Sequence, residues 1–235
     1  MQRILAVAIV MASLAQASGA KAQGDDNGVG YTALLTTPSA GVTPIARQWM
    51  LSDPSKRMGV DAQWGHLWGN GANFDMVTGG LTFPTSSGKA DFGVSAGYGK
   101  LSCAGCAGYL VASGVYEGSL MQSTGASSVF TLGLNGRVGY ARSDGTSYWS
   151  GSVGLPLSLA FGQGNAIRIV PFFTPAFGVG HIGADLSETG VRFLVGGGIG
   201  ILSQSAGIGA TLGVQRIIAN GGKTVFGVGM SVIPR

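Results

Sequence analysis

The residues with chemically capable side chains are few, and most lie at alternate positions of apolar segments. Asn135 and Arg137 stand in "VFTLGLNGRVGY", where Leu134 and Val138 flank them. Successive side chains of a β-strand point to opposite faces, so the polar and apolar residues form two separate faces. The same pattern holds for the other members of this candidate polar cluster, which are Asp61, Arg168, Arg192 and Gln215, with Asp75 as a possible addition.

Two kinds of chemistry fit this polar cluster if the strands close into a barrel with the apolar face outside. Buried charges need partners, so one interpretation is an interior plug of ion pairs and hydrogen bonds that stabilises the barrel. The other is the constriction of a narrow pore, which an excess of Arg over Asp would make selective for anions. The many Gly and Ser at interior positions favour an open lumen, and the sequence leaves both interpretations open.

Cys103 and Cys106 lie in a Gly-rich turn, "LSCAGCAGYL", between two alternating segments. A thioredoxin-like redox pair needs a βαβ unit around the motif, which is absent from this pattern. A zinc site needs further ligands, and the two histidines of the chain do not stand at a suitable spacing. In an oxidising, exported compartment the spacing favours a disulfide that staples the loop.

The two histidines, His66 and His181, lie near the ends of alternating segments. Ser is plentiful, so a Ser–His pair in an outer-membrane lipid-modifying enzyme is one alternative. No G-x-S-x-G motif occurs, and no Ser, His and acid stand at a suggestive spacing. The sequence therefore predicts no catalytic residue, no metal site, no cofactor and no enzymatic activity.

About ten alternating segments position these side chains. They cover residues 58–66, 73–83, 90–101, 109–120, 129–140, 149–161, 166–181, 191–202, 207–217 and 224–233. Asp144-Gly145 marks a hairpin, and the other joins, such as "PTSSGK", "GQGN" and "ANGG", are equally short. Joins of this length leave no room for helical crossovers, so the sequence predicts an all-β, antiparallel, up-and-down sheet.

The composition indicates what covers the apolar face. Charged residues make up 10% of the chain, against about 25% in soluble domains, and Gly occurs 43 times. No long apolar stretch follows the N-terminal segment, which excludes helical membrane spans. These features predict a single transmembrane β-barrel of about ten strands, within a range of eight to twelve. The formal net charge of +4, without a run of basic residues, argues against a nucleic-acid partner.

The N-terminal segment has the layout of a secretory signal peptide. Arg3 precedes an apolar run, and the small-x-small sequence Ala20-Lys21-Ala22 precedes Gln23. We therefore expect residues 1–22 to be removed on export. Residues 23–57 do not fit the meander and are expected to form an arm, a plug or an additional strand, and residues 58–235 form the barrel.

Aromatic residues near the segment ends fit the dimensions of a membrane. Phe130 and Tyr140 are ten residues apart on one face, or about 33 Å of strand. At a tilt of roughly 40° this projects to about 25 Å, the height of the apolar band on transmembrane barrels. The residues expected at the two membrane interfaces are Trp68, Tyr98, Tyr140, Trp149 and Phe161. The alternative is that these aromatics cap a soluble core.

With its signal peptide and its repeated apolar–glycine alternation over residues 58–233, the chain resembles bacterial outer-membrane β-barrel proteins of the small OmpA-like and porin type. The resemblance implies a Gram-negative outer membrane as the location, with outer-membrane lipid and the barrel-assembly machinery as partners. Proteins of this family commonly end in an aromatic residue. This chain ends "SVIPR", and Phe226 is its nearest aromatic residue.

The expected function is that of an outer-membrane barrel, either structural or a narrow pore for small solutes. The rival is a soluble periplasmic carrier of lipocalin type, with the apolar face turned inward around a ligand. The two hypotheses assign opposite directions to the same residues. A carrier would expose the Gly-, Ser- and Arg-bearing face to water, and the few charges of this chain argue against its solubility.

Overall fold

A computed structural model describes residues 58–68, 73–85, 89–102, 106, 108–125, 127–143, 146–162, 165–183, 188–203, 205–218 and 223–233. The expected signal peptide, the N-terminal arm and Cys103 lie outside these residues. Within them the chain forms β1 (Gly59–Trp68), β2 (Phe74–Pro84), β3 (Ala90–Leu101), β4 (Gly108–Thr124), β5 (Ser128–Ser143), β6 (Thr146–Gly154), β7 (Leu157–Phe161), β8 (Ile167–Gly183), β9 (Glu188–Ser203), β10 (Ile208–Ile217) and β11 (Thr224–Val232).

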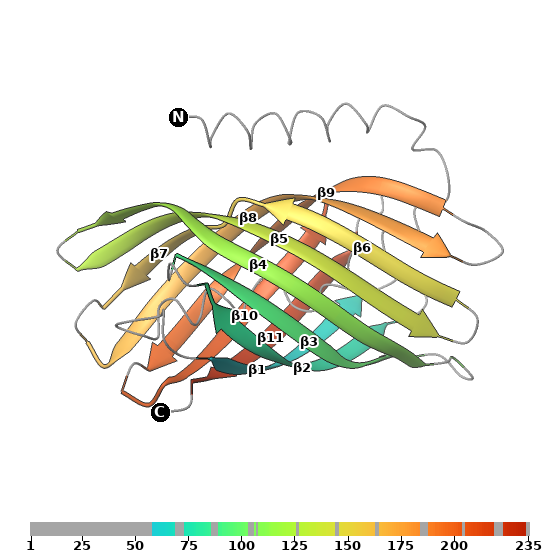
Figure 1. Ribbon diagram of the computed structural model, residues 1–235, viewed down its shortest axis with the longest axis horizontal. Coiled ribbons are helices and arrows are strands. Elements are labelled where there is room, and N and C mark those ends of the chain that lie inside the picture. Colours follow the sequence, from blue (N-terminus) through green and yellow to red (C-terminus); the bar gives the residue numbers. More distant parts are fainter. Residues whose placement is uncertain are drawn as a thin grey trace.

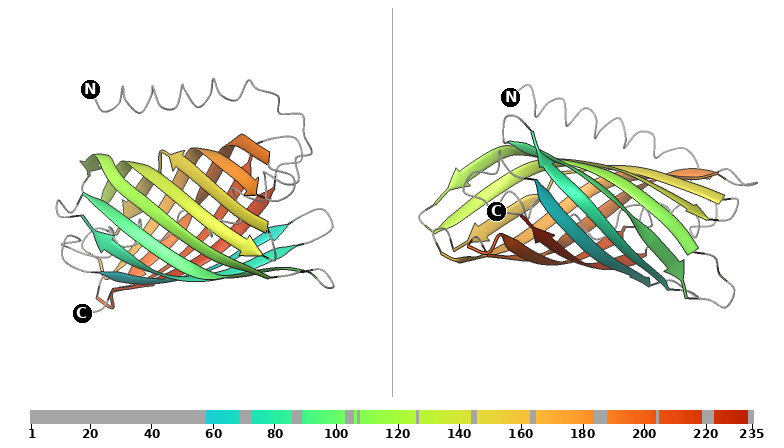
Figure 2. Two further views of the ribbon diagram at one scale, coloured as in Figure 1. Left: turned by 45° about the vertical axis from the view of Figure 1, so that its right-hand side comes forward. Right: turned by 60° about the horizontal axis from the view of Figure 1, so that its bottom comes forward.

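The described strands form one closed antiparallel barrel. Apart from β6 and β7, which do not pair with each other, each strand pairs with its neighbour along the chain, and β1 closes the circle by pairing with β11. Because β6 and β7 both lie between β5 and β8, the barrel has ten strand positions in the described part of the chain. Figure 1 shows the strands crossing the barrel obliquely, and Figure 2 shows the closed wall from two further directions. The predicted fold class is confirmed.

One predicted strand, residues 149–161, is interrupted. Leu155 and Pro156 separate β6 from β7, because proline has no N–H group to donate to the sheet. Two backbone hydrogen bonds join the gap to the neighbouring strands. Gly133 N–H on β5 donates to the Pro156 carbonyl at 2.7 Å, and Leu155 N–H donates to the Pro175 carbonyl on β8 at 3.0 Å. The two halves therefore stay in one strand position.

Exposure along the strands follows the predicted alternation. In β10, every even-numbered residue is exposed and every odd-numbered residue is buried, so that Leu212 is 47% exposed while its neighbour Thr211 is 5% exposed. Large apolar side chains lie on the outer surface of the wall throughout the barrel, with Val138 63% exposed and Leu110 69% exposed. The wall thus turns its apolar face outward and its small or polar face inward.

Two apolar clusters occupy the interior near opposite ends of the barrel. We call the end at which β1 joins β2 and β5 joins β6 the distal end, and the end at which β11 leaves the barrel the terminal end. The distal cluster contains Leu67, Phe74, Met76, Val111, Ala141, Ala176, Leu194, Ile217 and Val225. The terminal cluster contains Val129, Ala160, Val170, Phe172, Leu202 and Ile233. Most of the inward polar residues lie along the strands between these clusters.

Candidate functional site

The six predicted members of the polar cluster all occupy inward positions. Asp61, Asn135 and Gln215 are almost fully buried, at 6%, 2% and 7% exposure. The three Arg residues are half-buried. Each stands two residues before a buried residue of the same strand and so points to the same, inward face; these buried residues are Gly139, Val170 and Leu194. The strands therefore position these side chains through alternation alone.

The three arginines do not form one cluster. Arg137 on β5 and Arg192 on β9 lie on one row of paired residues, which runs through Ser152 and Gly178. Three strand spacings separate them along the wall, or about 14 Å. Arg168 pairs instead with Leu202 near the terminal end. The structure thus distributes the cations over the interior.

Asp61 is the centre of a hydrogen-bonded group on β1, β2 and β11. Its carboxylate accepts hydrogen bonds from the hydroxyl groups of Thr82 and Ser231, which lie on the two neighbouring strands. All three side chains are buried. These hydrogen bonds stabilise the barrel, because the two hydroxyl groups replace the hydrogen bonds from water that the carboxylate loses when it is buried.

Asp91 and Glu117 are interior residues that the sequence reasoning missed. They pair directly across β3 and β4, and they are 0% and 3% exposed. Glu117 also interacts electrostatically with Arg137, its diagonal neighbour on β5. The available signal was weak, because the alternation of residues 109–120 is poor and Asp91 is only the second residue of β3.

These two carboxylates change the charge balance expected for the interior. The sequence interpretation set three arginines against one or two aspartates. The described inward residues include the acids Asp61, Asp91 and Glu117 beside the cations Arg137, Arg168, Arg192 and Lys223. Cations still outnumber acids, but by a smaller proportion than the sequence interpretation assumed, and an anion-selective constriction stays a prediction.

A small polar cavity lies between β5, β6, β8, β9 and β10. Asn135, Arg137, Ser152, Thr174 and Gln215 line it, together with Ala176 and Gly196. Its volume of about 10 Å³ suits roughly one water molecule. Thr174 Oγ1 and Gln215 Oε1 are buried without a hydrogen-bond partner in the protein. Water in this cavity would satisfy polar atoms that the side chains leave unpaired.

Asp75, the possible addition to the interior cluster, faces outward. Its carboxylate lies 2.8 Å from His66 Nδ1, on the directly paired position of β1. The His66 ring in turn packs between two tryptophan rings. Its centroid lies 5.9 Å from that of Trp64 and 4.8 Å from that of Trp68. Residues 73–83 did not reveal their parity in sequence, and the structure assigns the inward positions to Phe74 and Met76.

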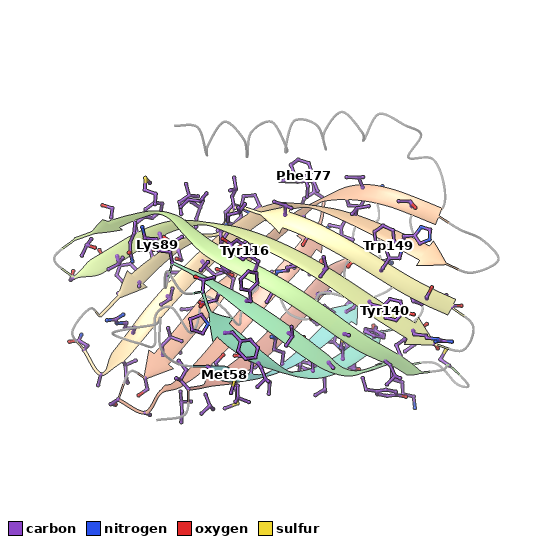
Figure 3. All side chains as sticks on the ribbon, viewed as in Figure 1. Met58, Lys89, Tyr116, Tyr140, Trp149 and Phe177 are labelled. Carbon is purple, nitrogen blue, oxygen red and sulfur yellow. The ribbon has the colours of Figure 1, made fainter. Side chains whose placement is uncertain are left out.

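The predicted interfacial aromatics all lie exposed on the outer surface. Trp68, Tyr98, Tyr140 and Trp149 lie toward the distal end, and Phe161 lies at the terminal end. Tyr140, Trp149 and His181 follow one another across paired strands, and the Trp149 and His181 rings stack at 5.2 Å. Figure 3 labels Tyr140 and Trp149 at this end and Met58 and Lys89 toward the other.

His181 and His66 lie far apart on the outer wall, on β8 and β1. His181 forms a 2.7 Å hydrogen bond with Thr189 Oγ1, whereas His66 contacts Asp75. The part of the chain that the structure describes contains no group of three or more His, Cys, Asp or Glu that could hold a metal ion. Since Cys103 lies outside the described residues, the disulfide between Cys103 and Cys106 stays a prediction.

Within the described ranges, no helix is long and apolar enough to cross a membrane.

No family model and no curated protein matches the chain. Among solved structures, it is similar to the translocator domain of the autotransporter NalP from Neisseria meningitidis, with a TM-score of 0.37 and 16% identity over 79% of this chain and 93% of that one. It is also similar to Ail, the attachment invasion locus protein of Yersinia pestis, with a TM-score of 0.31 and 8% identity over 76% and 97% of the two chains. The KdgM porin gives a TM-score of 0.31 and 8% identity over 74% and 98%. These similarities are weak, and the assignment of a closed barrel stands on the strand pairing.

Proposed function

We propose that the mature chain is an integral outer-membrane protein whose barrel wall crosses the bilayer. One observation carries this proposal. The same strands expose large apolar side chains such as Val138 and Leu212 on the outer wall and bury polar ones such as Asn135 and Gln215 inside. That arrangement suits the hydrocarbon core of a bilayer, where backbone N–H and C=O groups must form their hydrogen bonds within the closed sheet.

The rival carrier requires the opposite orientation. In a lipocalin-type barrel the alternating apolar residues line the cup and the polar residues meet water. Here Trp64, Val138 and Leu212 lie on the outside, where water would leave a large contiguous apolar surface exposed. Outer-membrane lipid and the barrel-assembly machinery are accordingly the proposed partners.

Within the barrel, the geometry favours a structural interior over an open pore. The inward carboxylates Asp61, Asp91 and Glu117 are at most 6% exposed, which places them among packed neighbours. Apolar clusters lie at both ends of the polar region. Both features support an interior that stabilises the barrel and an outer wall that carries the function of the protein.

A narrow pore is the second candidate, and the cavity beside Asn135 and Gln215 favours it. A narrow pore needs a row of water molecules along its axis, and the unpaired polar atoms and the water-sized space would hold one of them. Small solutes would follow only if that space connected to both ends.

Planar-bilayer conductance of the refolded mature protein separates the two candidates. A structural interior predicts no steady conductance above that of the lipid, whereas a pore predicts ohmic steps. Membrane placement has its own test: the protein should leave its membrane only with detergent. Release by salt or carbonate would overturn the proposal itself.

A further inference from the structure

A groove of about 590 Å³ is cut into the outer surface of β3, β4, β5, β6 and β8. Its floor is formed at three outward positions that carry no side chain, Gly114, Gly136 and Gly151. A Cβ atom added at Gly136 would meet nothing within 4 Å, so the space above the floor is empty of protein. The groove is therefore a consequence of glycine standing where the pattern elsewhere has a large apolar residue.

The rim of this groove is apolar and aromatic. Phe92, Tyr116 and Phe177 stand on one row of paired residues, and Val94, Val138 and Val179 stand on the next. Tyr116 and Phe177 are labelled near the middle of the wall in Figure 3. The volume lies within the range of about 300–1,000 Å³ that is typical of ligand pockets.

The next row toward the distal end is amphipathic. Tyr140, Trp149 and His181 follow there, each two residues beyond a groove residue on its strand. Trp and Tyr prefer the level of lipid headgroups, where their rings are apolar and their polar atoms meet water. The apolar groove thus ends at a row of side chains suited to a membrane interface.

A cation stands directly beyond the aromatic row. Arg142 is exposed and lies two residues past Tyr140 on β5, or about 13 Å along the strand from Val138 in the groove. Lys100 is a second exposed cation at this end, on the neighbouring outer surface of β3. The one described acid with outward parity here, Asp75, lies against His66. Among the described residues, the charge at the distal end of the groove is therefore complementary to an anion.

We propose that this groove binds one acyl chain of an anionic, phosphate-bearing membrane lipid, whose phosphate contacts Arg142. The order of groove, aromatic row and cation matches the order of acyl chain, interface and phosphate along such a lipid. The inference rests on the proposed function, because it requires that the outer wall face the bilayer.

Tryptophan quenching by brominated lipids tests the proposal. Two single-Trp variants of the full protein are needed: one keeps Trp149, beside the groove, and the other keeps Trp64, on β1 away from it. Each is reconstituted in phosphatidylcholine vesicles with rising fractions of acyl-brominated phosphatidylglycerol or phosphatidylcholine. At low salt, Trp149 should favour the brominated phosphatidylglycerol by about fivefold, and Trp64 should show no such preference.

Two further variants assign the preference to the groove and to the cation. In the Trp149 background, Gly136→Leu fills the groove and Arg142→Gln removes the charge, and each should abolish the fivefold preference. Ala210→Leu adds the same bulk at an exposed position of β10 and should leave the preference intact. Resistance to unfolding in cold detergent confirms that each variant has folded.

The outcomes distinguish this inference from the proposed function. Equal quenching of Trp149 by both lipids would overturn the lipid site and leave the membrane placement standing. Absence of quenching at both Trp149 and Trp64 would overturn the membrane placement. Protection of Trp149 alone, together with crosslinked dimers, would mean that a second copy of the chain covers the groove, and would overturn the lipid site.

Discussion

Two parts of the wall follow the same alternation and present different outer surfaces. On β1, β10 and β11, which we call the smooth wall, a row of outward positions carries Trp64, Val228 and Leu212. On the strands that form the groove, which we call the groove wall, the rows carry glycine at three central positions, Gly114, Gly136 and Gly151. Alternation therefore decides that both surfaces face outward, and the size of the outward side chain decides whether the surface is smooth or hollow.

The inner surfaces of the two walls differ as well. Behind the smooth wall, the Asp61 carboxylate accepts hydrogen bonds from hydroxyl groups on both neighbouring strands. Behind the groove wall, Glu117 and Asp91 pair across two strands, and Arg137 supplies the positive charge near Glu117. The first arrangement depends on hydrogen bonds to a carboxylate, and the second depends on the balance of buried charges.

Reversing the charge of Arg137 should produce the largest effect. Arg137→Glu would place a third carboxylate near Glu117 and Asp91 and remove the cation that acts on the buried Glu117. A buried charge left without compensation typically costs about 3–5 kcal/mol. The free energy of unfolding, measured by urea titration in lipid vesicles, should fall by this amount. Arg216→Glu, at an exposed position of β10, should change it little. Equal losses in both variants would show that Arg137 does not compensate the charge of the buried Glu117.

A charge on the smooth wall should be the next most damaging change. Leu212→Arg introduces a cation near the middle of β10, which costs about 2–4 kcal/mol at the bilayer midplane and about 0–1 near the interface. Ile218→Arg, just beyond the distal end of the same strand, is the matched control. Unfolding in vesicles should separate the two variants. If Arg at both positions were equally tolerated, this wall would not face hydrocarbon.

Removing the Asp61 carboxylate tests the inner side of the smooth wall. Asp61→Ala leaves the hydroxyl groups of Thr82 and Ser231 without their acceptor, which should lower the free energy of unfolding by about 1–3 kcal/mol. Asp61→Asn retains one acceptor oxygen and should lose less. Equal losses for Asn and Ala would mean that the negative charge itself, and not the acceptor oxygen that Asn retains, stabilises this wall.

Reduction of the predicted disulfide should have the smallest effect. A bridge between Cys103 and Cys106 would close a loop of only a few residues, and chain entropy then allows at most about 2 kcal/mol of stabilisation. Mass spectrometry without reductant should show a mass lower by two hydrogen atoms than that of the reduced protein. Free thiols in freshly purified protein, or bound zinc in equal amount, would contradict the prediction.

The sequence predicted the fold well because alternation is a property of each strand by itself. Residues such as Leu212 and Gln215 reveal their faces through neighbours two positions away. Asp75 and Glu117 were misjudged or missed for the same reason, since their segments alternate poorly. Pro156 is the only sign in the sequence of the break between β6 and β7. The sequence does not indicate that the two strands keep one strand position.

The sequence by itself determined the strands, their short antiparallel joins and the direction of most side chains, because these depend on contacts between residues close along the chain. Only the tertiary structure decided which strands' residues meet. Glu117 lies near Arg137, and Gly114, Gly136 and Gly151 share one floor, because the register of three strands brings them together. Register is set by closure of the whole barrel, in which every strand must match two neighbours at once, and no single segment carries that information.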